Sequence, residues 1–261
     1  MKLISFDPLR TWDIKGVHAL KVGEWQQALD EIKHADWVLF PEYWQVNFLT
    51  YGLKKRIFPS VSSYHLGHNK VEMTRAFEVV APHNLPYTQI TPRTEDVVGQ
   101  VLDDFPLPLV AKEIHNSMGR GIFLIETRQE LEAYVAQNHM LYVQEYLPID
   151  RDVRVVIVGR EVVTSYWRIA PPGGFHSNVA RGGQISLDAV PEAAITLALE
   201  TARQLGIDHA GFDVALVDGK PYLLEFNLRF GNEALRQQEI HLGPIIRAYL
   251  EAEMSGDEPG R

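Results

Sequence analysis

Residues 211–227 read G-F-D-V-A-L-V-D-G-K-P-Y-L-L-E-F-N, two apolar strands joined at an Asp-Gly turn. The strands keep polar groups among valine, leucine and phenylalanine: Asp213 on the first arm, Glu225 and Asn227 on the second. Side chains alternate between the two faces of a strand. The register of this hairpin therefore decides whether three potential ligand groups lie together.

The length of the turn sets that register. A two-residue turn places Asp213 and Glu225 on opposite faces, whereas a three-residue turn over residues 218–220 places them directly opposite each other. In the second register Asn227 shares their face. The residues that then fall on the other face, suited to packing against helices, are Val214, Leu216, Tyr222, Leu224 and Phe226. We therefore predict the three-residue turn.

Two carboxylates in such cross-strand contact, with Cβ atoms about 5 Å apart, repel each other unless a positive group lies between them. A Mg²⁺ ion, which prefers oxygen ligands, would supply that charge. A structural ion pair of Asp213 or Glu225 with arginine or lysine would also supply it. The hairpin alone favours neither alternative.

The composition excludes several classes of protein. The 261 residues are 46% apolar and 23% charged with a formal net charge of −9, which is ordinary for a soluble enzyme-sized protein of one or two domains. The longest basic run is the triplet at residues 54–56 and no cysteine is present, so nucleic-acid surfaces, disulfides and cysteine zinc sites are not expected. Neither a signal peptide nor a membrane-length apolar run is seen. We expect a cytoplasmic protein without nucleic-acid or membrane partners.

Residues 1–65 alternate short apolar runs with helical pattern. Strands are expected over residues 2–6, 36–40 and 56–59, and a helix over residues 24–35. This order predicts a short Rossmann-like βαβ unit with a parallel sheet.

The rest of the chain mixes helices and strands in α+β order. Helices are expected over residues 68–80, 95–105 and 191–205, and strands over residues 87–90, 109–114, 122–125, 141–147, 154–158 and 161–167. Thr127 and Glu130 form a capping box at the start of a further helix. Gly206 is expected to end the helix over residues 191–205. Residues 254–261 are polar and are expected to form a disordered tail.

Mg²⁺ bound by carboxylates usually also binds substrate phosphates, which predicts a nucleotide pocket elsewhere in the chain. Lys112 ends an apolar strand before the loop H-N-S-M-G-R-G, which contains Ser117, Gly119 and Gly121. A lysine beside a glycine loop can bind phosphate oxygens. An ordinary strand–turn–strand hairpin without a ligand would have the same sequence pattern. Lys70, at the start of a helix, is a second phosphate candidate or an ordinary surface residue.

A further candidate is the run Gln144, Glu145, Tyr146 and Leu147, which leaves an apolar strand. The backbone groups of such a strand exit can bind the edge of an adenine. A solvated strand end would have the same sequence.

Taken in order, these segments resemble the ATP-grasp superfamily, and most closely its RimK-like branch, the glutamate ligases that modify ribosomal protein. The resemblance covers residues 69–227, and its most specific parts are D-V-R-V-V-I-V-G-R-E-V-V, R-I-A-P-P-G-G-F-H-S-N-V-A-R-G-G and G-F-D-V-A-L…E-F-N. It implies an ATP-grasp fold over residues 66–253, with two α+β subdomains that grip ATP. The ATP-covering subdomain would lie within residues 86–147, and the metal- and phosphate-binding subdomain would span residues 148–253.

The resemblance also implies a role for each candidate residue. Arg168 would meet the transferred phosphate, and Arg229 would reach an anionic substrate. Asp213, Glu225 and Asn227 would bind two Mg²⁺ ions, for which Mn²⁺ is expected to substitute. The implied nucleotide-binding residues are Lys70 and Lys112 at the phosphates, Ser117, Gly119 and Gly121 in the loop over them, Gln144, Glu145, Tyr146 and Leu147 at the adenine, Asp152 at the sugar, and His176, Ser177 and Asn178 beside the phosphates.

The sequence departs from this branch at three places. His176 stands where the branch commonly has arginine, and histidine can be neutral near pH 7. After Asn227 the chain reads L-R-F-G-N-E, which looks more like the end of the glycinamide ribonucleotide synthetase motif than the usual Ser-Pro-Gly-like turn. Residues 1–65 are shorter than a typical leading domain, so the carboxylate pocket is expected to be open or completed by a partner.

The activity that the resemblance implies is an ATP-dependent carboxylate–amine ligase that forms an acyl phosphate. Its substrates would be small-molecule or peptide carboxylates and amines, with amino acids or peptides favoured. The alternatives are another ATP-grasp enzyme that forms an acyl phosphate or transfers a phosphoryl group without an amine, and a nucleotide-binding module without chemistry. The sequence is compatible with a homodimer but does not require one.

Overall fold

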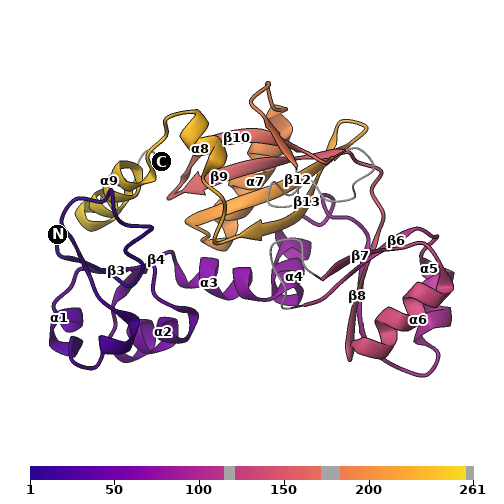
Figure 1. The fold of residues 1–261 in the computed structure, drawn as a ribbon, viewed down its shortest axis with the longest axis horizontal. Coiled ribbons are helices and arrows are strands. Elements are labelled where there is room, and N and C mark those ends of the chain that lie inside the picture. Colours follow the sequence, from indigo (N-terminus) through magenta and orange to yellow (C-terminus); the bar gives the residue numbers. More distant parts are fainter. Residues whose placement is uncertain (115–120, 172–182, 257–261) are drawn as a thin grey trace.

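The computed structural model describes residues 1–114, 121–171 and 183–256. Over these ranges the strands form three sheets. Figure 1 shows the N-terminal sheet and the small sheet at opposite ends of the molecule, with the large sheet between and above them. Within these ranges, no helix is both long and apolar enough to cross a lipid bilayer.

The N-terminal sheet is entirely parallel and has the order β2-β1-β3-β4. Its strands are β1 (Leu3–Ser5), β2 (Val17–Ala19), β3 (Trp37–Leu39) and β4 (Arg56–Phe58). The helical segments between them are the 3₁₀ turn η1 (Val22–Glu24), α1 (Leu29–Lys33), α2 (Tyr43–Asn47) and the π-helical turn η2 (Phe48–Gly52). The predicted helix over 24–35 is thus broken into η1 and α1, and Ala28 offers α1 no capping side chain.

The small sheet is antiparallel, with the order β5-β8-β6-β7. Its strands are β5 (Thr88–Pro92), β6 (Leu109–Lys112), β7 (Ile122–Ile125) and β8 (Met140–Glu145). Two helices, α5 (Val97–Asp104) and α6 (Arg128–Gln137), share one apolar core with this sheet. The predicted capping box is present at the start of α6, where the Thr127 hydroxyl accepts a hydrogen bond from the Glu130 N–H at 3.3 Å.

The large sheet is antiparallel, with the order β11-β10-β9-β12-β13. Its strands are β9 (Arg151–Val158), β10 (Glu161–Ile169), β11 (Gln184–Ser186), β12 (His209–Val217) and β13 (Lys220–Asn227). One face packs against α4 (Lys70–Val80) and α7 (Glu192–Leu205). As predicted, Gly206 ends α7 in the left-handed conformation, with φ of 67°.

Three further helices lie outside the three sheets. α3 (Val61–His68) leads from the N-terminal sheet into α4, and α8 (Glu233–Gln237) and α9 (Leu242–Ser255) follow the large sheet. Ile246 and Leu250 of α9 pack into the same core as Leu3 and Phe58. The end of the chain therefore covers the sheet with which it begins, as Figure 1 shows at the left.

The turn of the β12–β13 hairpin corrects the sequence prediction. Val217 pairs with Lys220, so the turn has two residues, Asp218 and Gly219, instead of three. Their φ angles of 51° and 80° are those of a tight hairpin turn, which an Asp-Gly pair adopts readily.

A β-bulge nevertheless brings the two carboxylates opposite each other. The ladder shifts by one residue at Leu224, so that Asp213 pairs with Glu225 as predicted. The shift also places the side chain of Leu223, which is 1% exposed, in the core, where the sequence prediction had placed Leu224. An inserted residue changes the face of every side chain beyond it, and here it restores the register that the turn alone would have lost.

Candidate functional site

The face of the large sheet opposite α7 collects polar and charged side chains. Alternation along the strands places Val153, Phe212 and Phe226 in the core with α7 and their neighbours on the other face. The side chains on that face are Asp152 and Arg154 of β9, Arg168 of β10, Asp213 of β12, and Glu225 and Asn227 of β13. Cross-strand register joins Asp152 to Arg168, Arg154 to Asp213, and Asp213 to Glu225.

Four of these side chains form a buried ion-pair network. Arg154 Nε donates to Asp213 Oδ1 at 2.6 Å, and Arg168 Nη2 lies 2.9 Å from Asp213 Oδ2. Arg168 Nε donates to Asp152 Oδ1 at 2.7 Å. None of the four side chains is more than 9% exposed. Burial would lower the pKa of Arg168, but the two carboxylates outweigh it and raise that pKa, so Arg168 is charged.

Arg154 was missed by the sequence analysis. Its signal is the pattern D-V-R-V-V, in which two charged residues alternate with valine in a strand. Gly211 makes room for it: a Cβ atom there would lie 2.8 Å from Arg154 Nη1 and 2.9 Å from Arg154 Cδ. Asp213 therefore forms ion pairs with arginine. This is one of the two alternatives that the hairpin sequence left open.

Glu225 lies near a different set of cations, the two lysines Lys70 and Lys112. The Asn227 side-chain amide donates to Glu225 Oε1 at 3.0 Å. Burial lowers the pKa of Lys70 and of Lys112, and the charge of Glu225 opposes part of that lowering in both. Lys112 also lowers the pKa of Lys70. Glu225 and the two lysines thus lie within electrostatic range of one another.

Each lysine comes from a different part of the fold. Lys70 is the first residue of α4, whose N-cap Asn69 accepts a hydrogen bond from the Val71 N–H at 2.8 Å. Lys112 ends β6 in the small sheet, and its ammonium lies 5.4 Å from the centre of the Tyr142 ring. The site is therefore assembled from the large sheet, the small sheet and the helix between them.

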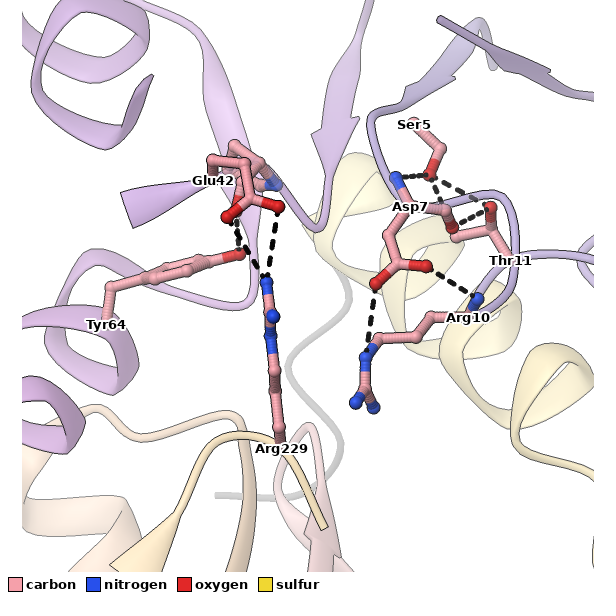
Figure 2. Close-up of polar contacts among 8 residues, drawn as sticks. Ser5, Asp7, Arg10, Thr11, Glu42, Tyr64 and Arg229 are labelled. Atoms are coloured by element: carbon pink, nitrogen blue, oxygen red, sulfur yellow. Dashed lines mark hydrogen bonds and ion pairs between the residues drawn. The ribbon is translucent and has the colours of Figure 1, made fainter. Parts of the chain in front are cut away.

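The remaining predicted residues lie as follows. β8 ends at Glu145, just before Tyr146 and Leu147, and the Gln144 amide donates to Thr88 Oγ1 at 2.8 Å. Arg229 follows β13 and contacts Glu42 at 3.4–3.5 Å (Figure 2). Gly121 has a φ of 69°. Ser117, Gly119, His176, Ser177, Asn178 and the end of the tail, residues 257–261, lie outside the described residues.

The donor set suits a hard cation only in part. Glu225 and Asn227 offer carboxylate and amide oxygens, the ligands that Mg²⁺ prefers. Both oxygens of Asp213 already accept from guanidinium groups. Within residues 1–114, 121–171 and 183–256, no cluster of three or more histidine, cysteine, aspartate or glutamate side chains could hold a metal. Of the predicted metal ligands, Glu225 and Asn227 are therefore the pair that fits.

Solved structures of the same fold extend over nearly the whole chain. A RimK-domain ATP-grasp protein from Sphaerobacter thermophilus superposes with a TM-score of 0.69, covering 95% of this chain and 99% of that one at 15% identity. The D-alanine–D-alanine ligase of Bacillus anthracis in complex with ATP gives a TM-score of 0.72, with 98% and 97% coverage and 15% identity. The fold is thus an ATP-grasp fold, as the sequence predicted.

The family follows from sequence matches. The model of the RimK-like ATP-grasp domain matches residues 72–249, and the chain belongs to that family. A ribosomal protein bS6–L-glutamate ligase of Escherichia fergusonii is 32% identical over 195 residues, 70% of this chain. A probable α-L-glutamate ligase of an Enterobacter species is 33% identical over 196 residues. The predicted membership in the RimK-like branch of the ATP-grasp superfamily is confirmed. The matches to these two glutamate ligases each cover 65% of the relative's length.

Proposed function

We propose that this chain is an ATP-dependent ligase that joins a carboxylate to an amine. The observation that carries the proposal is the convergence of Lys70, Lys112 and Glu225 beside the arginine–aspartate network of the large sheet. Burial lowers the pKa of both lysines, and Glu225 opposes that lowering at each of them. Glu113 also opposes it at Lys70, and Asp213 at Lys112. Lysines gathered in this way can bind phosphate oxygens. A nucleotide with several negative charges fits that place. The names of the relatives, which are glutamate ligases, support the same reaction class.

Each residue then has a physical task. Lys70 and Lys112 bind the phosphates of ATP, and the strand exit after Gln144 binds the adenine. Glu225 and Asn227 would hold Mg²⁺, which when bound neutralises phosphate charge. Asp213 positions Arg168 through the ion pair between them.

The proposed reaction has two steps. An oxygen of the substrate carboxylate attacks the γ-phosphorus of ATP, the bond to the β-phosphate oxygen breaks, and ADP leaves with the bonding electrons. The amine then attacks the acyl carbon, loses a proton and expels inorganic phosphate. Arg168 stays charged and fixed between Asp152 and Asp213. A fixed cation of this kind stabilises the charge that develops on the transferred phosphoryl group without reorganising.

The test is ATP-dependent release of ADP, measured with pairs of amino acids and peptides in the presence of Mg²⁺. We expect release to require both a carboxylate and an amine, and phosphate to appear in equal amount. The Lys112→Ala variant should lose ATP affinity, whereas Lys220→Ala, an exposed lysine at the hairpin turn, should not.

Two results would contradict the proposal. Release of ADP at the same rate without any amine would indicate phosphoryl transfer alone. Binding of ATP without turnover in every pair would indicate a nucleotide-binding module.

A further inference from the structure

A pocket lies beside β4, the edge strand in the N-terminal sheet order β2-β1-β3-β4. Its volume is about 420 Å³, and its lining contains none of the residues of the proposed ligase site. The lining residues are Trp37, Thr50, Lys55, Arg56, Ile57, Ser60, Val61 and Glu253. Pockets that bind small molecules usually have volumes of about 300–1,000 Å³. The pocket therefore has the size for an organic molecule and not only for a single ion.

The walls of the pocket come from both faces of the N-terminal sheet. Thr50 lies in η2, whose Leu49 packs into the core on one face. Glu253 lies in α9, whose Leu250 packs into the core on the other face. The start of α3 closes the pocket at the carboxyl end of β4. Four separate elements thus meet around one space.

The chain that enters β4 has an unusual backbone conformation. Thr50 belongs to a π-helical turn, a rare structure that is found frequently at functional sites. Lys54 has a φ of 54°, in the left-handed region that residues other than glycine seldom adopt. Such strain is concentrated at sites that bind ligands. The segment that supplies Thr50 and Lys55 to the pocket is therefore held in a conformation that local preferences alone do not explain.

Two of the lining residues carry buried polar atoms without a partner. Trp37 is 6% exposed. Among the described residues, its Nε1 and Thr50 Oγ1 are both buried and form no hydrogen bond. Buried polar groups in folded proteins are hydrogen-bonded with few exceptions, and an unpaired one lowers stability. The indole N–H can only donate, so the partner that it lacks is an acceptor.

The two cations of the pocket contact neutral groups. Lys55 Nζ donates to the Lys33 and Ala35 carbonyl oxygens at 2.6 and 2.8 Å. Arg56 Nη1 donates to the Glu253 carbonyl oxygen at 3.1 Å. Carbonyl oxygens do not neutralise a charge, and an ammonium has three N–H donors and a guanidinium five. Both cations therefore keep donors and charge for a ligand.

The other polar groups of the lining favour the same sign of ligand charge. The Glu253 carboxylate lies 3.0 Å from Arg160, a cation that offsets its charge. Val61 is the first residue of α3, so its N–H has no acceptor within the helix and lies at the positive end of the helix dipole. The pocket thus presents an excess of donors and of positive charge.

This donor set indicates which anion fits. The phosphate group of an ester has three strong acceptor oxygens and a charge of about −1.5 to −2 near pH 7. A carboxylate has two oxygens and one charge, so it satisfies fewer of these donors and offsets only one of the two cations. The rest of the pocket is lined by Ile57, Val61 and the Trp37 ring, which suits an apolar group.

We propose that this pocket binds a small organic phosphate monoester. Its phosphate oxygens accept from Lys55 and Arg56 and from the unpaired donors of Trp37 and Thr50, and its organic part packs against Ile57 and Val61. The pocket is a second anion site of the chain, separate from the lysines that are proposed to bind ATP.

The test is a titration of the whole chain, followed by the indole N–H signals of its five tryptophans in ¹H–¹⁵N NMR spectra. Trp37→Phe assigns the signal of Trp37. The probes are phenyl phosphate, benzoate, phenol and inorganic phosphate. We expect phenyl phosphate to shift the Trp37 signal and to saturate the shift, and the other three probes to bind about tenfold more weakly or not at all.

Variants separate a binding role from a structural one. Arg56→Ala should raise the dissociation constant for phenyl phosphate about tenfold or more. Thr50→Val removes an unpaired hydroxyl, so the melting temperature should stay the same or rise while affinity falls several-fold. A purely structural Thr50 would leave affinity unchanged. Arg128→Ala, an exposed arginine paired with Glu132 on α6, is the matched control and should change neither quantity.

Three results would overturn the proposal. Phenyl phosphate could leave the Trp37 signal unmoved, benzoate could bind as tightly as phenyl phosphate, or the affinity could stay the same in both Arg56→Ala and Thr50→Val. Lys112→Ala should leave the titration unchanged, and loss of binding in that variant would place the probe at the proposed nucleotide site instead. None of these measurements depends on turnover, so the ADP-release assay succeeds or fails separately.

Discussion

Two sets of arginine–carboxylate pairs in this protein differ in burial and in geometry. On the large sheet, Arg154 and Arg168 bind Asp213 and Asp152 at 2.6–2.9 Å in a network that water hardly reaches. Between the end of β13 and the segment after β3, Arg229 and Glu42 meet at 3.4–3.5 Å, and both side chains are exposed. The first set is a fixed part of the sheet, whereas the second is long, exposed and therefore weak.

The difference in burial suits the two sets to different roles. A guanidinium that stabilises developing phosphoryl charge must not move during the reaction, and buried carboxylates hold it. A group that binds and releases a substrate must exchange partners at low cost, and exposed pairs allow that. The same residue types can therefore suit opposite purposes, depending on the depth at which they lie.

The largest expected effect comes from opening the buried network. Asp213→Ala leaves Arg154 and Arg168 buried with a partner missing, and should lower the free energy of unfolding by about 3–5 kcal/mol. Denaturant titration measures it. Asp150→Ala is the control, because Asp150 forms an exposed pair with Arg151 and its loss should cost less than about 1 kcal/mol. Equal effects in the two variants would mean that burial does not distinguish these pairs.

A second test concerns a buried carboxylate bound mainly by neutral donors. Asp208 accepts from the Ser60 N–H at 2.7 Å and from the Ser63 hydroxyl at 3.1 Å, and burial raises its pKa to about 6 from 3.8. The folded state therefore binds the proton more tightly, and the contribution of Asp208 to stability falls as pH rises from about 4 to about 6.

Asp208→Asn keeps an oxygen acceptor and removes this titration. The difference in unfolding free energy between variant and wild type should shift in favour of the variant as pH rises through that window. Chemical denaturation at several pH values measures it. A difference that does not vary with pH would show that Asp208 titrates as an ordinary carboxylate.

The next effect tests the space that Gly211 leaves for Arg154. In Gly211→Ala the new Cβ would lie within 3 Å of the Arg154 side chain, and we expect a loss of about 1–3 kcal/mol in unfolding free energy. Gly99→Ala in α5 is the control, because nothing lies within 4 Å of its Cβ position; it should stabilise the protein by up to about 1 kcal/mol. If both variants had the same stability, the inferred close contact between Gly211 and the Arg154 side chain would be contradicted.

The smallest effect is expected at the exposed Arg229–Glu42 pair. A double-mutant cycle with Arg229→Ala and Glu42→Ala should give a coupling of less than about 1 kcal/mol. Thermal unfolding in the absence of ligand measures it. A coupling as large as that between Arg154 and Asp213 would remove the distinction between the two regions.

The sequence predicted the pairing of the two acids in the hairpin but not the turn that leads to it. Acids among apolar residues were enough to predict that Asp213 and Glu225 lie opposite each other. The route was different, because the tight Asp-Gly turn and the bulge at Leu224 together produce the register that a longer turn was expected to give. A bulge has no strong sequence signal of its own, since any half-buried residue can be the inserted one.

The partners of the predicted residues could not be read from the sequence. Arg154 meets Asp213, 59 positions away, because β9 lies beside β12 in the sheet. Arg229 meets Glu42, 187 positions away, because α9 and the N-terminal sheet share one core. Such contacts depend on topology. Local elements with their own signals, such as the α6 capping box and the Gly206 helix end, were predicted correctly.

The most direct test of the proposed chemistry is the Glu225→Gln variant, followed by ADP release and by thermal unfolding without metal. Glutamine keeps an oxygen for the Asn227 amide but removes the charge that a hard cation prefers. We predict that ATP-dependent activity collapses and is partly restored by excess Mg²⁺ or Mn²⁺. The melting temperature without metal should fall as well, because Lys70 and Lys112 lose the charge of Glu225, so activity is the measurement that decides. Retained activity with a large drop in melting temperature would make Glu225 a structural ion-pair residue and would contradict the proposed ATP chemistry.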